Sequence, residues 1–330
     1  MNGEVALLAV LAVPLLQGLL VLVCARPPGL RDAANILSAL AMAGLAGFLA
    51  NAAAHHEQVR VVLARPLPDV DLAFALDPIG ALVAAFITLL GLLHAVHSAG
   101  MLRATGEQAP ARLLAFQALS MAGALAVAFS ANLFTLFVAY QALSLAAFPM
   151  VEHRGEEAAG GAGRIFLAVL LTASLGLYLP AMVWTYSVAG VLEFQAGGVL
   201  AGLVTPLEAN LLLTLFVFGI AMAGAPPMHR WLSVSTAAPQ SALTSILALT
   251  VLPAGGVGVI KIAAFVFGPA LADAAFAAHA LIALCGIGMC VAALMALSQQ
   301  DMKQRLAYSC LTQALAILVG VLLARPTGYV

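Results

Sequence analysis

The sequence predicts an all-α polytopic membrane protein with about ten transmembrane helices and its N-terminus on the outer side. Hydrophobic residues make up 64% of the 330 residues and charged residues 8%, whereas an ordinary soluble domain is about 45–50% apolar and roughly a quarter charged. Windows of about 20 apolar residues recur, which is the length that a helix needs to cross a hydrocarbon core of about 30 Å. We therefore expect residues 1–330 to form a single transmembrane domain in a lipid bilayer.

Short segments rich in proline, glycine and charge separate the expected spans. The spans cover residues 5–25, 33–54, 78–101, 111–130, 132–151, 164–189, 208–226, 239–267, 276–298 and 304–323. The first span is preceded by neither a basic segment nor a clear cleavage site, so we expect it to remain as a helix. The second connection, residues 55–76, is long and polar, and its Val59–Leu63 stretch is typical of a short strand on the outer face.

The seventh span is interrupted by Gly224, Pro226, Pro227 and His229, which predicts a broken helix. Proline frees backbone carbonyl groups, and such backbone survives at membrane depth only inside protein or beside a water-filled cavity. Two interpretations follow. The break is an ion path that includes His229, or it is an ordinary helix end with a proline-rich loop.

Basic residues predict the orientation, because Lys and Arg in short connections stay on the cytoplasmic side. With the N-terminus outside, the cytoplasmic connections hold Arg26, Arg31, Arg103, Arg112, Arg154, Arg164, Arg230, Lys303 and Arg305. The outer side holds Arg60, Arg65 and Arg325, and Lys261 lies within a span.

Lys261 is a candidate proton-relay residue, because a lysine inside an apolar run is costly and usually faces an interior cavity or a partner. The alternative is that its ammonium group extends to the outer interface, which lies only a few residues away at Gly268.

Two further groups of polar residues allow either a structural or a functional interpretation. Asp301 and Lys303 lie where a cytoplasmic connection enters the last span, so they either start that helix or take part in charge movement at the membrane face. His94 and His97 lie three residues apart on one helix face, where interfacial histidines are commoner than a metal-binding pair.

Several classes of function find no support. The formal net charge of −1 favours no nucleic-acid partner. The four cysteines lack the spacing of a tetrahedral metal site, and there is no nucleotide-binding glycine loop, nucleophile elbow or pair of catalytic carboxylates. We therefore expect no catalytic residues, no metal and no cofactor within this chain.

Three separated motifs carry a resemblance to a known family. They are NLFTLFVAYQ at residues 132–141, GAPPMHRWL at 224–232 with Ala238-Pro239 after it, and DMKQRLAYS at 301–309. Over residues 75–323 the chain resembles the proton-translocating, antiporter-like membrane subunits of respiratory complex I, Mrp-type cation/proton antiporters and membrane-bound hydrogenases. The family core has fourteen helices, of which this sequence contains about ten.

The resemblance implies a relay that this sequence has lost. In the family, a glutamate on the fifth helix and a lysine on the broken seventh helix form the ion pair that drives proton movement. The matching positions hold Gln141 and Met222, and a further lysine of many relatives falls near Pro253. Glutamine and methionine carry no charge at physiological pH, so the usual relay cannot operate through these positions.

The resemblance thus implies a membrane subunit of an energy-coupling complex of the NADH-quinone oxidoreductase, Mrp antiporter or hydrogenase type. We expect it in a bacterial inner membrane beside other membrane subunits and peripheral redox subunits, which would carry any NADH, flavin or iron–sulfur chemistry. It would conduct protons or cations, or scaffold that conduction, with Lys261, Lys303, Asp301 and His229 as the remaining candidates. The alternatives are a membrane partner of a soluble zinc protein in inorganic-carbon uptake and a non-conducting scaffold subunit.

Overall fold

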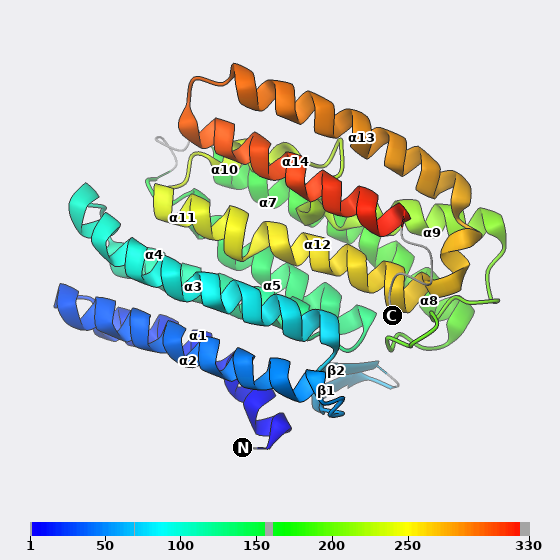
Figure 1. The fold of residues 1–330 in the computed structure, drawn as a ribbon, viewed down its shortest axis with the longest axis horizontal. Coiled ribbons are helices and arrows are strands. Elements are labelled where there is room, and N and C mark those ends of the chain that lie inside the picture. Colours follow the sequence, from blue (N-terminus) through cyan, green and yellow to red (C-terminus); the bar gives the residue numbers. More distant parts are fainter. Residues whose placement is uncertain (1, 69, 156–160, 324–330) are drawn as a thin grey trace.

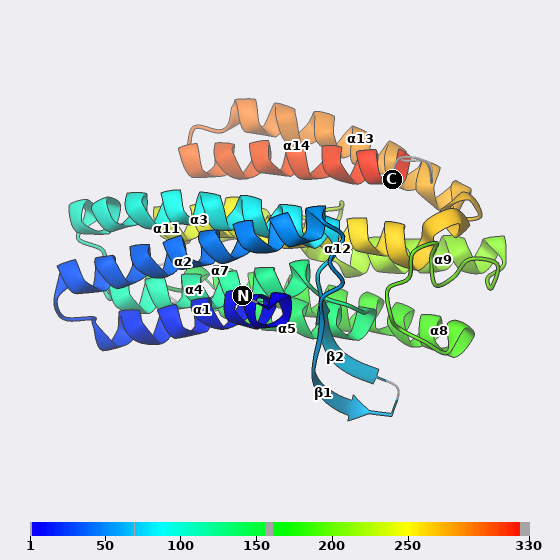
Figure 2. The same ribbon diagram turned by 60° about the horizontal axis from the view of Figure 1, so that its bottom comes forward.

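The chain forms a bundle of long helices in a computed structural model that describes residues 2–68, 70–155 and 161–323 (Figures 1 and 2). Nine helices in these described ranges are long and apolar enough to cross a membrane. They are α1 (Gly3–Val23), α2 (Pro28–Ala54), α3 (Pro78–Thr105), α4 (Pro110–Ala128), α5 (Leu133–Val151), the composite α7–α8 (Ala162–Ala189), the composite α11–α12 (Gln240–Phe267), α13 (Ala275–Ser298) and α14 (Met302–Leu323). The prediction of an all-α polytopic membrane protein is confirmed.

The remaining predicted span is a broken helix. It begins as α9 (Pro206–Gly219), passes through a 3₁₀ turn at Ala221–Ala223 and resumes as the short α10 (Arg230–Ser235). Gly224, in the left-handed conformation with φ +80°, and the cis bond between Pro226 and Pro227 lie between them. The sequence-based prediction of a break at these residues is confirmed.

Two composite spans contain π-helical turns. Ser174–Tyr178 joins α7 (Ala162–Ala173) to α8 (Leu179–Ala189). Ser245–Leu249 joins α11 (Gln240–Thr244) to α12 (Val251–Lys261), and Ile262–Phe267 continues α12 as a second π segment. Such wide turns inside a helix often occur at functional sites.

Side-chain caps fix where several helices begin. The Asp77 carboxylate accepts the Gly80 N–H at the start of α3, and the Asn132 amide oxygen accepts the Thr135 N–H at the start of α5. A reciprocal pair of hydrogen bonds between Thr205 and its helix forms a capping box at α9. These caps satisfy N–H groups that would otherwise lack partners at a helix end.

The long second connection folds into a β-hairpin at one end of the bundle (Figure 2). Strand β1 (Arg60–Leu67) pairs antiparallel with β2 (Val70–Ala75). The predicted strand at Val59–Leu63 is thus confirmed in place, but it begins one residue later and is longer than expected. Its partner β2 was not predicted.

Backbone hydrogen bonds connect this hairpin to two other connections. The Ala75 N–H donates to the Phe129 carbonyl at 2.8 Å, and the Ala131 N–H donates to the Ala73 carbonyl at 3.0 Å. The turn between α4 and α5 in turn accepts the Phe194 N–H at the Ala131 carbonyl, at 3.1 Å. Three connections far apart in the sequence therefore form one hydrogen-bonded unit at what we call the hairpin end.

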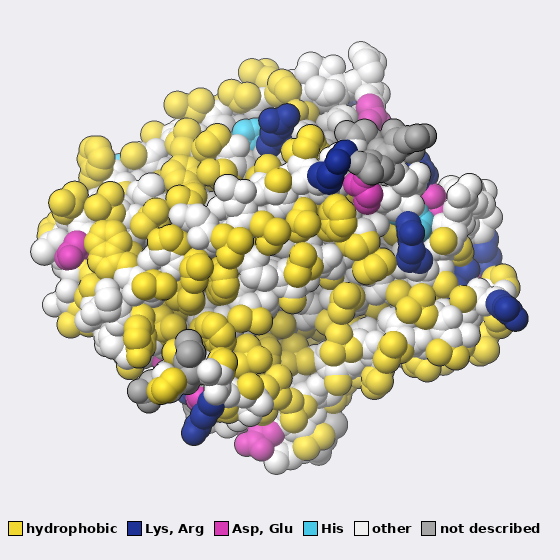
Figure 3. All heavy atoms as spheres, turned by 180° about the vertical axis from the view of Figure 1, so that it is seen from behind, with side chains coloured by type: hydrophobic (Ala, Val, Ile, Leu, Met, Phe, Trp, Pro, Cys, Tyr) yellow, Lys and Arg dark blue, Asp and Glu magenta, His cyan; other side chains and the backbone are white. Residues whose placement is uncertain are grey.

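Further ion pairs lie at the opposite end, which we call the basic end. Arg103 Nη2 lies 2.6 Å from Asp32 Oδ2 and joins α3 to the start of α2. Arg154 Nη2 lies 2.9 Å from Glu107 Oε2 and joins the end of α5 to the turn between α3 and α4. Between the ends, hydrophobic side chains cover most of the surface that Figure 3 shows, as expected for helices in contact with lipid.

Candidate functional site

Lys261 forms a buried ion pair with Asp77 near the hairpin end. Its Nζ atom lies 2.8 Å from Asp77 Oδ2 and also donates to the Ser130 carbonyl at 2.9 Å. The Phe194 ring centre is 5.7 Å from the same nitrogen, within range of a cation–π contact. Lys261 is 0% exposed, so its ammonium group is held inside the protein and does not extend into the lipid interface.

Asp77 links this pair to an open cavity. Its side chain is 19% exposed, and it lines a cavity of about 300 Å³ at the hairpin end. Arg60 and Glu193 line the same cavity and form their own ion pair at 2.9 Å. The arrangement places a carboxylate between a polar, open space and a buried ammonium group.

Gly80 permits the close approach that this site needs. A Cβ atom at Gly80 would collide with the Ala128 carbonyl of α4, so α3 and α4 can meet here only with glycine at this position. The nearby turn places the Ser130 carbonyl within reach of Lys261.

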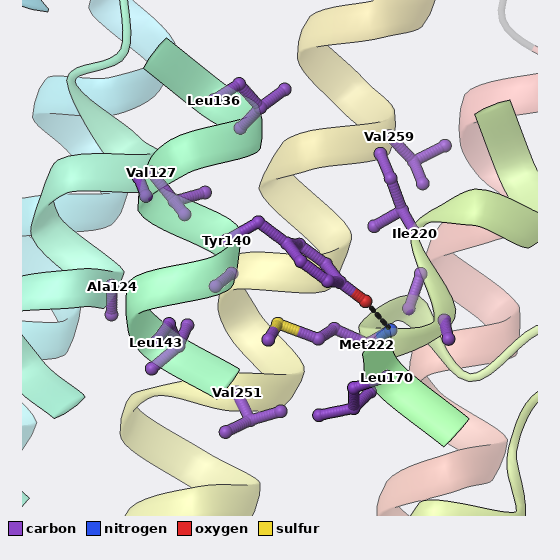
Figure 4. Packing of buried hydrophobic residues seen from close by; sticks show 14 of the residues in the cluster. Ala124, Val127, Leu136, Tyr140, Leu143, Leu170, Ile220, Met222, Val251 and Val259 are labelled. Atoms are coloured by element: carbon purple, nitrogen blue, oxygen red, sulfur yellow. Dashed lines mark hydrogen bonds between the residues drawn. The ribbon is translucent and has the colours of Figure 1, made fainter. Parts of the chain in front are cut away.

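The 3₁₀ turn at the break lies inside protein. Met222 is 0% exposed, and its N–H donates to the Tyr140 hydroxyl at 3.1 Å (Figure 4). The Trp231 indole N–H donates to the Ala221 carbonyl at 2.7 Å. Gly255 of α12 allows the contact, because a Cβ atom there would collide with the Met222 carbonyl carbon and the Ala223 nitrogen. These contacts satisfy part of the backbone that the break releases.

His229 lies at the far side of the break. It lines a cavity of about 280 Å³ together with Pro226, Gly288 and Tyr308. Its buried Nδ1 atom has no hydrogen-bond partner among the described residues. The structure does not bring His229 to Lys261. His229 lines its own cavity, whereas Lys261 contacts Asp77 and the Ser130 carbonyl.

Lys303 and Asp301 serve as attachment points at the basic end. The Lys303 ammonium donates to the Ala238 carbonyl at 2.7 Å and to the Thr236 carbonyl at 3.3 Å, which holds α14 against the corner between α10 and α11. Asp301 Oδ1 accepts the Lys303 N–H at 3.1 Å, as a residue preceding a helix does. This geometry favours the structural interpretation of the motif.

Glu107 and Arg154 complete the electrostatics of this end. Their hydrogen bond lowers the pKa of the Glu107 carboxyl and raises the pKa of the Arg154 guanidinium. Both groups therefore stay charged over the physiological range, and the pair is a fixed feature of the membrane face.

Comparisons with known proteins identify the family. The model of the transmembrane family "NADH:quinone oxidoreductase/Mrp antiporter, TM" matches residues 130–329. This chain belongs to that family.

Individual relatives agree with the family match. A chloroplastic NAD(P)H-quinone oxidoreductase subunit 2 from Nephroselmis olivacea is 23% identical over 78% of this chain and 51% of its own length. Hydrogenase-4 component B from Escherichia coli is 26% identical over 78% of this chain and 38% of the relative. NADH-quinone oxidoreductase subunit N 1 from Sorangium cellulosum is 31% identical over 61% of this chain and 42% of the relative. The chain therefore spans about half, or less, of the length of these relatives.

Solved structures share the fold. A chain of the archaeal membrane-bound sulfane sulfur reductase superposes with a TM-score of 0.79 at 20% identity, covering 96% of this chain and 64% of its own. A chain of the Mrp complex from Dietzia superposes with a TM-score of 0.81 at 24% identity, covering 99% of this chain and 60% of its own.

The two residues at which the resemblance places the family's relay, Gln141 and Met222, are neutral and in contact with other residues. Gln141 Nε2 donates to the Ser174 hydroxyl at 2.8 Å, at the π turn between α7 and α8. Met222 packs its thioether in the hydrophobic core between Tyr140 and Leu170 (Figure 4). Neither side chain can carry a proton in this setting.

Sequence reasoning identified Lys261 but not its partner. Asp77 directly precedes Pro78, which is a signal for the start of a helix and gives no hint of an ion pair 184 residues away in sequence. The buried Arg31–Asp32 pair, with Nη2 and Oδ1 2.7 Å apart, was also not predicted, because Arg31 was counted only as a basic residue of a cytoplasmic connection. In the described part of the chain, no group of three or more His, Cys, Asp or Glu residues is placed to hold a metal ion.

Proposed function

We propose that this chain is a membrane subunit of a multi-subunit energy-coupling complex and that it contributes to proton or cation translocation there. The family match over residues 130–329 carries the proposal, because it includes the broken helix and the two motifs that flank it. The names of the relatives, NADH-quinone oxidoreductase subunits and a hydrogenase component, support a complex with redox chemistry elsewhere. Other membrane subunits would be its immediate partners, and peripheral redox subunits would hold any cofactors.

The charged element that this chain contributes is the Lys261–Asp77 pair. Gln141 and Met222 leave the relay positions without charge, whereas the Lys261 ammonium is buried and in contact with a carboxylate that lines an open cavity. A buried ion pair beside a polar cavity is a common feature of proton paths in membrane proteins. Lys303 donates to backbone carbonyls and therefore serves attachment in this proposal.

The first experiment identifies the complex. The tagged chain is purified in mild detergent from its native membrane, which we expect to be a bacterial inner membrane, and the bound proteins are identified by mass spectrometry. Stoichiometric redox or antiporter subunits would support the proposal. A soluble zinc protein as sole partner would replace it with a role in inorganic-carbon uptake, and recovery of the chain alone would contradict it.

The second experiment tests conduction. Proton flux is measured in vesicles that contain the purified complex with Lys261→Met, Lys303→Met or the control Arg305→Met, which changes an exposed basic residue at the same end as Lys303. We expect at least a tenfold loss of flux for Lys261→Met at equal amounts of assembled complex, and little change for the other two. Full flux in the assembled Lys261→Met complex would leave this chain as a non-conducting scaffold.

A further inference from the structure

A second polar site lies inside the bundle, among helices that the relay positions do not involve. A small cavity, with about 30 Å³ available to the centres of water molecules, is enclosed by α1, α2, α3, α4 and the π turn before α12. Its polar lining residues are Gln17, Asn35, His94, Gln117 and Ser245. A water molecule needs at least about 10–15 Å³ of such space and two to four polar partners, so this cavity has room for one or two.

Two buried polar atoms at this cavity lack partners among the described residues. Gln17 is 5% exposed, and its amide Nε2 donates to Asn35 Oδ1 at 2.7 Å. That bond fixes the amide and leaves Gln17 Oε1 without a hydrogen-bond partner among the described residues. His94 Nε2 also has no partner among them. Leaving a buried polar atom unpaired is costly, so two such atoms at one cavity point to a small polar molecule that binds both.

We propose that this cavity holds water that bridges Gln17 and His94, and that His94 is a protonatable site fed by that water. The ligand class is therefore water and the proton that it delivers. Among the described residues, no aspartate, glutamate, lysine or arginine lines the cavity, and the titratable neighbour on α3 is the exposed His97. The amide and hydroxyl groups of Gln17, Gln117 and Ser245 are the other polar groups that face this water and the His94 ring.

The position of the site gives it a use. Most of its lining residues belong to the first four helices, whereas Lys261 pairs with Asp77 at the hairpin end. The His94 imidazole is a titratable group in a chain whose two family relay positions, Gln141 and Met222, are neutral. The transport role of the site rests on the proposed function, but its hydration and protonation do not.

Hydration and protonation are tested by solid-state NMR of the intact complex in lipid with ¹⁵N-labelled histidine. The His94 signal is assigned by its loss in His94→Gln, and His97→Gln serves as the matched control three residues away. We expect magnetisation transfer from water to the His94 ring and a titration of its nitrogen shifts, both altered by Gln17→Met. A His94 ring without water contact, or with no titration, would overturn the proposal.

Flux separates the transport role from the site itself. We expect His94→Gln to lower proton flux of the assembled complex at least fivefold and His97→Gln to leave it within twofold of the parent. Normal flux in His94→Gln would overturn the transport role. If the parent complex shows no flux at all, the proposed function fails, and the NMR result alone then decides whether the water site exists.

Discussion

The two carboxylate oxygens of Asp77 have different tasks. Oδ1 accepts the Gly80 N–H at 2.8 Å and caps α3, while Oδ2 accepts from Lys261 at 2.8 Å. Asparagine preserves the first task, because it is as good a helix cap as aspartate, but it removes the negative charge. The two contributions can therefore be separated by substitution.

We expect Asp77→Asn to destabilise the protein by about 3 kcal/mol, because it leaves the Lys261 ammonium buried without a counter-charge. Asp77→Ala should cost about 1 kcal/mol more, since it also removes the cap. Denaturant unfolding of the purified protein in detergent measures both. Equal stabilities of Asp77→Asn and the parent would show that the pair contributes nothing.

His153 has a defined tautomer at the basic end. Its Nε2 atom lies 2.8 Å from the Gln108 carbonyl and must donate, so Nδ1, 3.4 Å from Arg112 Nη2, is the acceptor. Burial, opposed by the Gln108 bond and assisted by the positive charge of Arg112, lowers the pKa of His153 below its usual value of 6.5. The folded protein thus favours the neutral imidazole.

Stability should consequently fall as the pH drops below about 6.5, because the unfolded chain then binds a proton that the folded chain resists. His153→Gln, which retains a donor and an acceptor, should flatten this part of the profile. Melting temperatures between pH 7.5 and 5 provide the test, above the range in which Glu107 titrates. Parallel profiles for the parent and the variant would refute the assignment.

At the scale of elements, the fit between α12 and the broken helix depends on one glycine. The Cβ position at Gly255 is occupied by the backbone of Met222 and Ala223. Among the described residues, a Cβ atom at the adjacent Gly256 would meet only Ile317 Cγ2, at 3.9 Å. The two neighbouring glycines therefore face different constraints within one helix.

Gly255→Ala should destabilise the protein by about 3 kcal/mol, because backbone cannot yield as a flexible side chain does. Gly256→Ala should be neutral or stabilise by up to about 1 kcal/mol, since alanine is the better helix former. Thermal unfolding of the two variants compares them directly. Similar effects at both positions would mean that α12 and the break are not in the contact described.

The elements themselves were largely predictable, because each span shows its apolar length and its punctuation in a local window. The break was predictable from Gly224, Pro226 and Pro227, and the structure has it there. The π turns were not, since residues such as Ser245–Leu249 have the composition of an ordinary helix. The Lys261–Asp77 contact and the His94 cavity depend on which faces of distant helices meet, and one sequence carries no local signal for that.

At the scale of the molecule, the two ends differ in charge and architecture. The basic end carries the ion pairs of Arg103 and Arg154, and the hairpin end carries β1 and β2. The Lys and Arg residues in the connections at the basic end predict that this end faces the cytoplasm and that the hairpin end faces outward. The structure fixes which segments share an end, and the orientation in the membrane stays a prediction.

Cysteine labelling tests this orientation in intact cells. In a background without the native cysteines, Glu57→Cys at the hairpin end should react with a membrane-impermeant maleimide from outside. Thr105→Cys at the basic end should react only after the membrane is opened; both positions are exposed. The reverse pattern would invert the topology.

The backbone hydrogen bonds at the hairpin end have a mechanical consequence. Because the Ala75–Phe129, Ala131–Ala73 and Phe194–Ala131 bonds join three connections, the ends of α3, α4, α5 and α8 cannot separate there without breaking several bonds together. Any tilting of these helices must pivot about this hydrogen-bonded unit, so the displacement of the helices increases toward the opposite membrane face. This hydrogen-bonded unit is therefore the pivot of such a movement. Lys261 donates to the Ser130 carbonyl within the unit, so its ammonium group would move little.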